Sequence, residues 1–144
     1  MRNVSHILSR KGSRVTTVSP NLTVLEALKM MADQNIGSVV VMESDKFLGI
    51  MTERDYSRKV ILKGKSSTDT TVGEIMTAEF PFIRRSDTVE YCMELLSERN
   101  LRYLPVIEND KLAGIISIND VVKETILSQQ ETITQLKDYL HSSL

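Results

Sequence analysis

Several residue types are scarce in this sequence, and each shortage excludes a class of protein. The chain has one cysteine, Cys92, which excludes an internal disulfide and a metal site built from clustered cysteines. Tryptophan is absent and aromatic residues make up only 5% of the chain, which argues against binding single-stranded nucleic acid by base stacking. The formal net charge is −1, so no excess of positive charge points to a nucleic-acid or membrane surface.

Long apolar runs are missing as well. No stretch approaches the length needed to span a bilayer, and residues 1–14 lack the apolar core of a signal peptide. We therefore expect a cytoplasmic protein. The 144 residues, 41% hydrophobic and 26% charged, are typical of a globular chain that forms one domain or two small ones sharing a core.

An internal repeat organises the chain. At an offset of 65 positions, residues 22–55 align with residues 87–120 without a gap, and ten aligned positions are identical, among them Gly49 and Gly114. The openings also match, since VSHIL resembles VGEIM. We predict four segments: a first repeat over 1–62, a polar linker over 63–71, a second repeat over 72–126 and a helical extension over 127–144.

Each repeat is predicted to have the same elements in the same order. An extended piece precedes a helix, which Thr23 begins in the first copy by a capping box with Glu26. Two short β-branched strands follow, joined by the hairpin turns ESDK and ENDK, and a second helix starts near Thr52 or Ser117. Apolar spacing places these residues on the inner faces of the first helices: Val24, Leu28, Met31, Ala32, Val89, Met93 and Leu96.

One such unit is too small to bury both faces of its short sheet. Two copies packed through their sheets can do so, with a pseudo-two-fold axis and two equivalent clefts. The predicted fold class is therefore α+β, made of two extended–α–β–β–α repeats.

The stretches GIMTERD and GIISIND raise the functional question. A hydroxyl residue followed three positions later by Asp, at a strand-to-helix junction, is typical of a helix cap, formed here by Thr52 with Asp55 and by Ser117 with Asp120. The same geometry also suits a nucleotide, because a hydroxyl can donate to phosphate and a carboxylate can accept from ribose hydroxyls. In that interpretation Gly49 and Gly114 let a ligand approach the backbone.

The chain resembles the CBS domain pair, or Bateman module, over about residues 4–126. The resemblance rests on TVSP, TVLEAL, GIMTERD, VGEIMT, RYLPVI and GIISIND. The chain departs from the pattern at Tyr103, where His is usual, and at Asn119, where Gly is usual.

This resemblance implies binding of an adenine nucleotide, commonly AMP, ADP or ATP and sometimes NAD or S-adenosylmethionine. Carried over by position, the first cleft would use Thr17, Ser38, Val39, Thr52, Arg54 and Asp55. The second cleft would use Ile83, Tyr103, Leu104, Ser117 and Asp120. Arg58 and Arg102 are further candidates for contacting phosphate, since guanidinium binds such oxygens in pairs.

Other candidate sites are weaker. GKS at 64–66 lacks the first glycine of a phosphate-binding loop, and His6 and His141 have no partner at ligand spacing. Cys92 falls on an apolar helix face, where it fills the core. No paired carboxylates or triad suggest catalysis, so we expect neither an enzyme nor a catalytic cofactor or metal.

Three hypotheses follow, of which the third, a hydrolase or transferase acting on the nucleotide, ranks last because no catalytic base or metal set is identifiable. In the first, the chain is a regulatory sensor of adenine nucleotides that acts on a separate partner, and it forms a homodimer as CBS modules usually do. In the second, it is a structural scaffold whose motifs only cap helices. The apolar spacing of the last helix fits either packing on its own domain or a dimer contact, and the resemblance favours the dimer.

Overall fold

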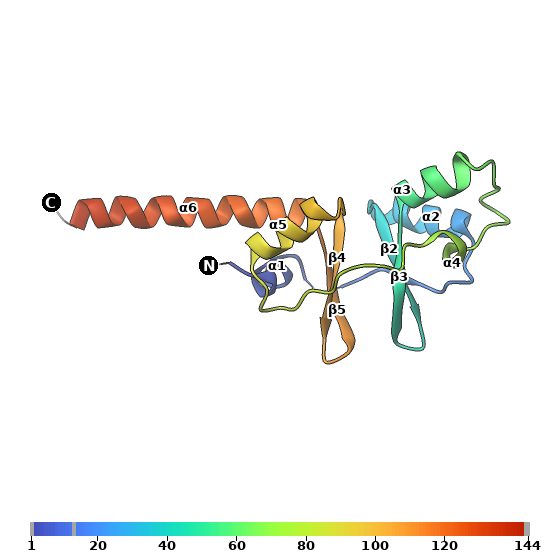
Figure 1. The fold of residues 1–144 in the computed structure, drawn as a ribbon, viewed down its shortest axis with the longest axis horizontal. Helices are drawn as coiled ribbons and strands as arrows, with labels where there is room; N and C mark the ends of the chain where they lie inside the picture. The colour runs from blue at the N-terminus through green and yellow to red at the C-terminus, as the bar shows by residue number, and fades with distance from the viewer. Residues whose placement is uncertain (1, 13, 143–144) are drawn as a thin grey trace. The chain divides into compact units, whose positions relative to one another are not determined.

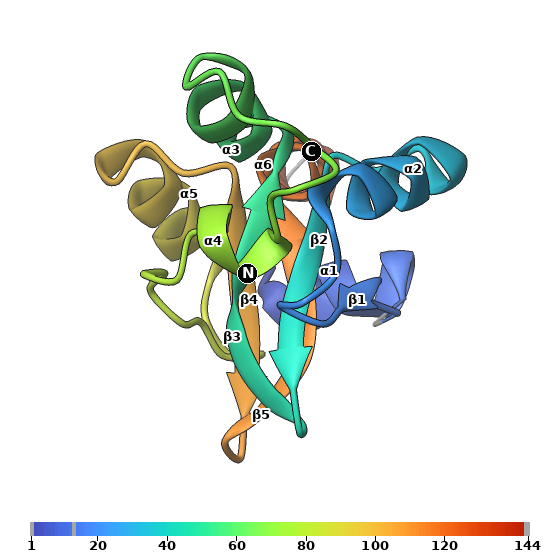
Figure 2. The same ribbon diagram turned by 90° about the vertical axis from the view of Figure 1, so that its right-hand side faces the viewer.

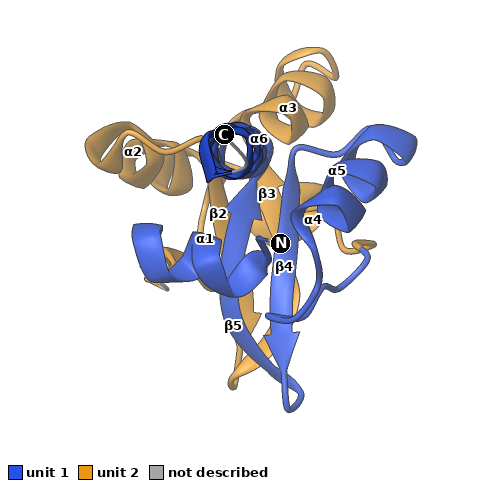
Figure 3. Ribbon diagram, turned by 90° about the vertical axis from the view of Figure 1, so that its left-hand side faces the viewer, with its two compact units in different colours: residues 1–13, 81–144 blue, residues 14–80 orange. Residues whose placement is uncertain are grey.

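The computed structural model describes residues 2–12 and 14–142, which form two compact units. One unit comprises Arg14–Phe80, and the other comprises Met1–Ser13 with Pro81–Leu144 (Figure 3). Each unit has its own buried apolar cluster. The fold is mixed α+β with two small sheets, as the repeats predict.

The unit of residues 14–80 is built around a three-stranded sheet. In chain order its elements are β1 (Thr17–Val18), α2 (Val24–Gln34), β2 (Ser38–Glu43), β3 (Lys46–Thr52), α3 (Glu53–Tyr56), the π-helical segment Ser57–Ile61 and α4 (Val72–Ile75). Strand β1 runs parallel to β2, and β2 pairs antiparallel with β3. Helices α2 and α3 lie at the end of the hairpin opposite its turn (Figure 2).

The other unit repeats this plan with a smaller sheet and a longer last helix. Its elements are α1 (Val4–Lys11), α5 (Val89–Glu98), β4 (Tyr103–Glu108), β5 (Lys111–Ser117) and α6 (Ile118–Ser142), as Figure 1 shows. Strands β4 and β5 pair antiparallel. The counterpart of β1 is reduced to a single parallel bridge between Ile83 and Val106.

The two hairpin turns have the backbone that their sequences predict. Ser44 and Asp45, like Asn109 and Asp110, have φ values between 50° and 63°. Two successive residues of positive φ form the tight turn whose twist matches that of the flanking strands, and Asn and Asp tolerate this conformation well.

The first helices bury the expected stripe with one correction. In α2 the buried residues are Val24, Ala27 and Met31, whereas Ala32 is exposed and Leu28 only partly buried. The prediction for Ala32 was wrong. The buried face of α2 is centred closer to Ala27, so Ala32 lies outside it. In α5 Val89 and Leu96 are buried as predicted, Met93 is partly buried, and Cys92 fills the core.

Each opening segment packs in the unit that contains the body of the other repeat. Helix α1 lies with 81–142, where Val4 N–H donates to the Asp87 carbonyl at 2.9 Å. Helix α4 lies with 14–80, where Val72 N–H donates in the same way to Leu22 at 2.8 Å. The boundaries of the compact units therefore fall near residues 13 and 80, whereas the sequence repeats end elsewhere.

The polar segment 63–71 is ordered against α2. The first-turn N–H groups of Val24 and Leu25 donate to the carbonyls of Thr70 and Ser67, at 2.9 and 3.0 Å. Thr70 is buried, and its hydroxyl donates to the Ser66 carbonyl. The segment thus supplies acceptors for helix N–H groups that have no partner within the helix.

Gly49 and Gly114 admit the opening segments. A Cβ atom on Gly49 would lie 2.5 Å from the Thr77 carbonyl oxygen, and one on Gly114 would lie 2.8 Å from Leu8 Cδ2. Ile50 and Thr77 exchange backbone hydrogen bonds at this point. The prediction that these glycines leave room for a ligand was wrong, because protein atoms occupy the space.

Gly49→Ala should lower the free energy of unfolding by about 1–3 kcal/mol, because a methyl group there must displace main chain. Gly114→Ala is the matched control and should cost less, because only the end of a flexible leucine must move. Urea denaturation of both variants measures the difference. Equal losses of unfolding free energy would show that the contact with the Thr77 main chain does not make Gly49 harder to replace than Gly114.

Candidate functional site

The first hydroxyl–acid motif forms a complete helix cap. Strand β3 ends at Thr52 and α3 begins at Glu53. Thr52 N–H donates to Asp55 Oδ2 at 2.9 Å, and Asp55 N–H donates to Thr52 Oγ1 at 3.1 Å. The structural interpretation of the motif is confirmed here, because each residue satisfies a main-chain donor of the other.

The second oxygen of Asp55 is also engaged. Oδ1 accepts from Thr77 Oγ1 at 2.9 Å and pairs with Lys59 Nζ at 3.0 Å. Lys59 also donates to the Ile75 carbonyl at 2.9 Å. Asp55 is only 6% exposed, so a ribose at this carboxylate would have to replace a partner from within the protein.

The second motif forms the same cap but keeps one oxygen open. Ser117 N–H donates to Asp120 Oδ2 at 2.8 Å, and Asp120 N–H donates to Ser117 Oγ at 3.2 Å. Lys11 Nζ donates to the same Oδ2 at 2.8 Å and to the Ile115 carbonyl at 2.9 Å. Over residues 2–12 and 14–142, no hydrogen bond reaches Asp120 Oδ1, and the side chain is 17% exposed.

The surroundings of Asp120 keep it ionised. Burial acts to raise its pKa, but the hydrogen bonds from Lys11 and from the Ser117 main chain, with the positive charge of Lys11, lower that pKa below its ordinary value. Asp120 is therefore a carboxylate at neutral pH, which can accept hydrogen bonds but not donate them.

Strand pairing brings other predicted residues beside these caps. Ser38 is the register partner of Thr52, and Tyr103 is that of Ser117. The main chain closes the same junctions, since Glu53 N–H donates to the Gly37 carbonyl at 3.2 Å and Ile118 N–H to Arg102 at 2.9 Å. Each hydroxyl–acid pair thus has the first residue of the neighbouring strand beside it.

The remaining predicted residues divide by burial. Val39, Leu104 and Ile83 are at most 1% exposed and belong to the cores of their units, so only their main chain could meet a ligand. Thr17 is exposed and pairs with Val40. Among the candidate arginines, Arg54 is partly buried in α3, whereas Arg58 and Arg102 are exposed.

Sequence reasoning missed the residues that complete each site. Lys11 and Thr77 come from opening segments far along the chain from the carboxylates they contact. Lys59 lies four positions after Asp55, a spacing that favours an ion pair on a helix. This spacing is the sequence feature from which Lys59 could have been predicted.

Two surface hollows lie among the described residues, and one of them borders the first cap. One of about 270 Å³ is lined by apolar residues of α2, by the loop residues 35–37 that precede β2, and by Glu53. Another of about 530 Å³ lies between Arg2 and the middle of α6. Neither contains a predicted nucleotide-binding residue.

The described residues offer few groups for metal binding or thiol chemistry. In the part of the chain that the structure describes, no three His, Cys, Asp or Glu side chains lie close enough to hold a metal ion. Cys92 is fully buried; burial, followed by Asp87 and Glu90, raises its pKa to about 12, which leaves the thiol protonated. None of the described helices is long and apolar enough to cross a membrane.

Comparisons with known proteins identify the family of the chain. The CBS domain family matches residues 4–61 and 72–126. The mitochondrial CBS domain-containing protein CBSX3 of Arabidopsis thaliana is 37% identical over 123 residues, covering 82% of this chain and 60% of that protein. YhcV of Bacillus subtilis is 26% identical over 141 residues, covering 98% of this chain and 99% of the relative.

A solved structure shows the same fold. A putative signal-transduction protein with CBS domains from Burkholderia ambifaria is 44% identical, with a TM-score of 0.85 over 89% of this chain and 96% of that chain. Because the family matches both repeats and most of their length, the chain belongs to the CBS domain family and carries two CBS domains.

Proposed function

We propose that this chain is a regulatory module that binds an adenine nucleotide and acts on a separate protein partner. CBS pairs generally bind adenosine-containing ligands and regulate partners, and they are typically not enzymes. The ligands expected are AMP, ADP or ATP, with NAD and S-adenosylmethionine as further candidates. A more distant CBS pair, that of protein MJ0100, is described in complex with 5′-methylthioadenosine and S-adenosyl-L-methionine.

The observation that carries this proposal is the open oxygen of Asp120. Its Oδ2 caps α6 and holds Lys11, which leaves Oδ1 to accept from ribose hydroxyls without breaking the cap. The Ser117 hydroxyl accepts from Asp120 N–H and also bonds to the Asp120 carboxylate, so it would contact a phosphate by turning its proton away from Asp120. Lys11 and Arg102 supply positive charge from this unit for the same phosphate.

The residues around Asp55 make the weaker of the two sites. Both of its oxygens already have partners, and it is nearly buried. Thr17, Ser38, Val39, Thr52, Arg54 and Asp55 remain the proposed contacts there, with Arg58 as a further phosphate partner. We infer tighter binding at Ile83, Tyr103, Leu104, Ser117 and Asp120.

The alternative function is a scaffold without a ligand, and the completed caps support it. Both motifs cap their own helices through contacts within the protein. In the sensor, by contrast, the nucleotide must favour one conformation or assembly of the protein in order to regulate the partner. We propose a homodimer as the regulatory form.

Calorimetry with AMP, ADP, ATP, NAD and S-adenosylmethionine tests binding directly. We expect heat of binding and a raised melting temperature with at least one adenine ligand, because a ligand that binds only the folded state stabilises it. Guanosine monophosphate is the control for the base. No heat and no thermal shift with the whole panel would favour the scaffold.

Conservative substitutions separate ribose binding from capping. Asp120→Asn should weaken nucleotide binding at least about tenfold, since a charged acceptor is lost, and should lower the unfolding free energy by less than about 1 kcal/mol. Asp55→Asn should cost about 1–3 kcal/mol, because its buried oxygens hold Thr77 and Lys59. If Asp120→Asn binds normally, Asp120 is only a cap.

Lys11→Met tests the charge beside Asp120. A carboxyl with a lowered pKa stabilises the fold above its unfolded pKa, and this contribution disappears as the pH falls through the folded pKa. Without Lys11 the pKa of Asp120 should rise, so the acid loss of stability should begin at higher pH. Carbon NMR titration of Asp120 and urea denaturation between about pH 2 and pH 7 measure both effects. An unchanged Asp120 pKa would contradict the assigned role of Lys11.

A further inference from the structure

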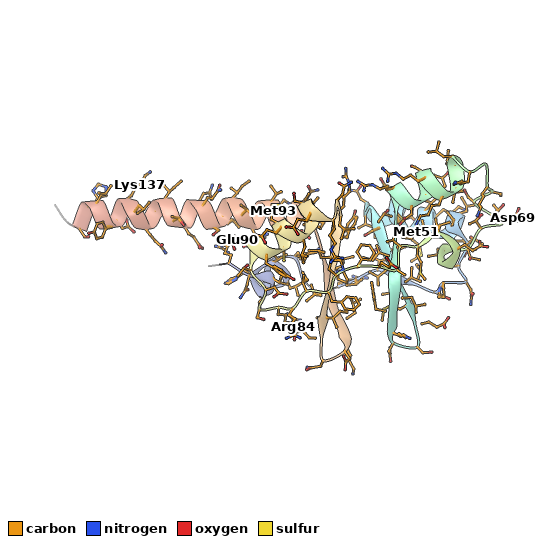
Figure 4. The ribbon with its side chains drawn as sticks, viewed as in Figure 1. Met51, Asp69, Arg84, Glu90, Met93 and Lys137 are labelled. Atoms are coloured by element: carbon orange, nitrogen blue, oxygen red, sulfur yellow. The ribbon has the colours of Figure 1, made fainter. Side chains whose placement is uncertain are left out.

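The last helix carries an apolar stripe that its own unit does not cover. Helix α6 begins at Ile118 and ends at Ser142, and all of its described residues from Gln129 onward are exposed. Figure 4 shows Lys137 on this stretch, beyond the helix α5 that carries Met93. The five apolar residues of the stripe are between 40% and 61% exposed: Val122, Ile126, Ile133, Leu136 and Leu140.

A different face anchors the base of α6. Val121 and Glu124 are fully buried, and Glu124 pairs with Arg10 and, at 3.0 Å, with Arg2. Arg2 also pairs with Glu131, about two helical turns beyond Glu124. These contacts hold the helix to α1 by its packed face and leave the apolar stripe facing away from that contact.

The spacing of the stripe is that of a two-stranded coiled coil. With Gln129 included, its six positions follow one another by steps of four, three, four, three and four residues. This is the alternation of a and d positions in a heptad repeat, with Ile126, Ile133 and Leu140 at a. The stripe is narrow, since the other positions from 129 to 142 are polar except Tyr139. A narrow a/d seam suits a second helix better than a broad apolar surface.

We propose that α6 is a parallel, in-register coiled-coil contact with α6 of a second copy of this chain. The seam spans about 27 Å at 1.5 Å per residue, and Gln129 occupies a central d position. In a parallel pair Gln129 faces Gln129 of the other copy, where each amide can donate to and accept from its equivalent. In the antiparallel pair that aligns the same seam, Gln129 faces Ile133 and loses this partner.

Charge favours the same orientation. Lys123 and Lys137 lie at e positions that flank the seam. The antiparallel pair places Lys123 of one copy against Lys137 of the other at both ends, whereas the parallel pair places Lys137 against Thr132. The hydroxyl of Thr132 donates to the Ser128 carbonyl of its own helix, so it needs no hydrogen-bond acceptor from the second helix.

Sedimentation velocity over a wide concentration range tests the contact. The wild-type chain should form a weak dimer, because fewer than three heptads with one polar layer bury little area. Ile133→Glu with Leu136→Glu should weaken dimerisation at least about tenfold, since both charges enter the seam. Thr134→Glu with Gln135→Glu adds the same charge on the same turns outside the seam and should leave dimerisation unchanged. Equal behaviour of the two double variants would overturn the proposal.

The result also separates this contact from the homodimer of the proposed function. A dimer that persists in the seam variant would be formed by another surface, which rejects the coiled coil and leaves the nucleotide sensor intact. A monomeric wild-type chain at all concentrations would reject both dimers. Gln129→Leu should tighten dimerisation about tenfold or more, and no change would remove Gln129 from the interface.

Cross-linking decides the orientation. Leu140→Cys should form a disulfide with itself on oxidation, because a positions face each other in a parallel pair. The wild-type chain is the control, since its one cysteine is fully buried. Cross-linking of Leu140→Cys only when it is mixed with Val122→Cys would show an antiparallel pair and overturn the proposal.

Discussion

The packing of each opening segment against a glycine of the neighbouring strand is the contact on which the rest of each unit depends. Only a residue without a side chain lets the Thr77 carbonyl come so close to β3, and Leu8 fills the equivalent place at Gly114. The segments then supply core residues such as Val4 and Ile75, which bury apolar surface that the hairpin alone would expose. They also bring polar side chains to the two motif carboxylates.

This contact makes the two carboxylates different even though their motifs match. One opening segment supplies the Thr77 hydroxyl, which together with Lys59 completes the shell of Asp55. The other supplies Lys11, which shares the Asp120 oxygen already used by the cap. The result is one carboxylate that is nearly saturated by protein and one that keeps an oxygen available. Capping and ligand binding are therefore compatible at Asp120, because they use different oxygens of one group.

Local chemistry explains how much of the fold could be predicted. The turn residues Ser44 and Asp45 and the cap at Thr52 depend on neighbours within three positions, so their sequence patterns were sufficient. The repeat likewise predicted two hairpins at matching positions, and both form. The buried side of α2 was misplaced by part of a turn at Ala32, because helical spacing gives a stripe but tertiary packing decides its centre.

The sequence by itself determined the two repeats, the helix and hairpin at the centre of each, and the hydroxyl–acid pairs at both strand-to-helix junctions. Only the tertiary structure decided that each opening segment joins the body of the other repeat, and hence that Lys11 meets Asp120 and Thr77 meets Asp55. The physical reason is the separation along the chain of the residues that make each contact. Caps, turns and strand alternation arise from contacts between near neighbours in the chain, whereas the environment of a carboxylate is set by side chains that burial brings from distant positions.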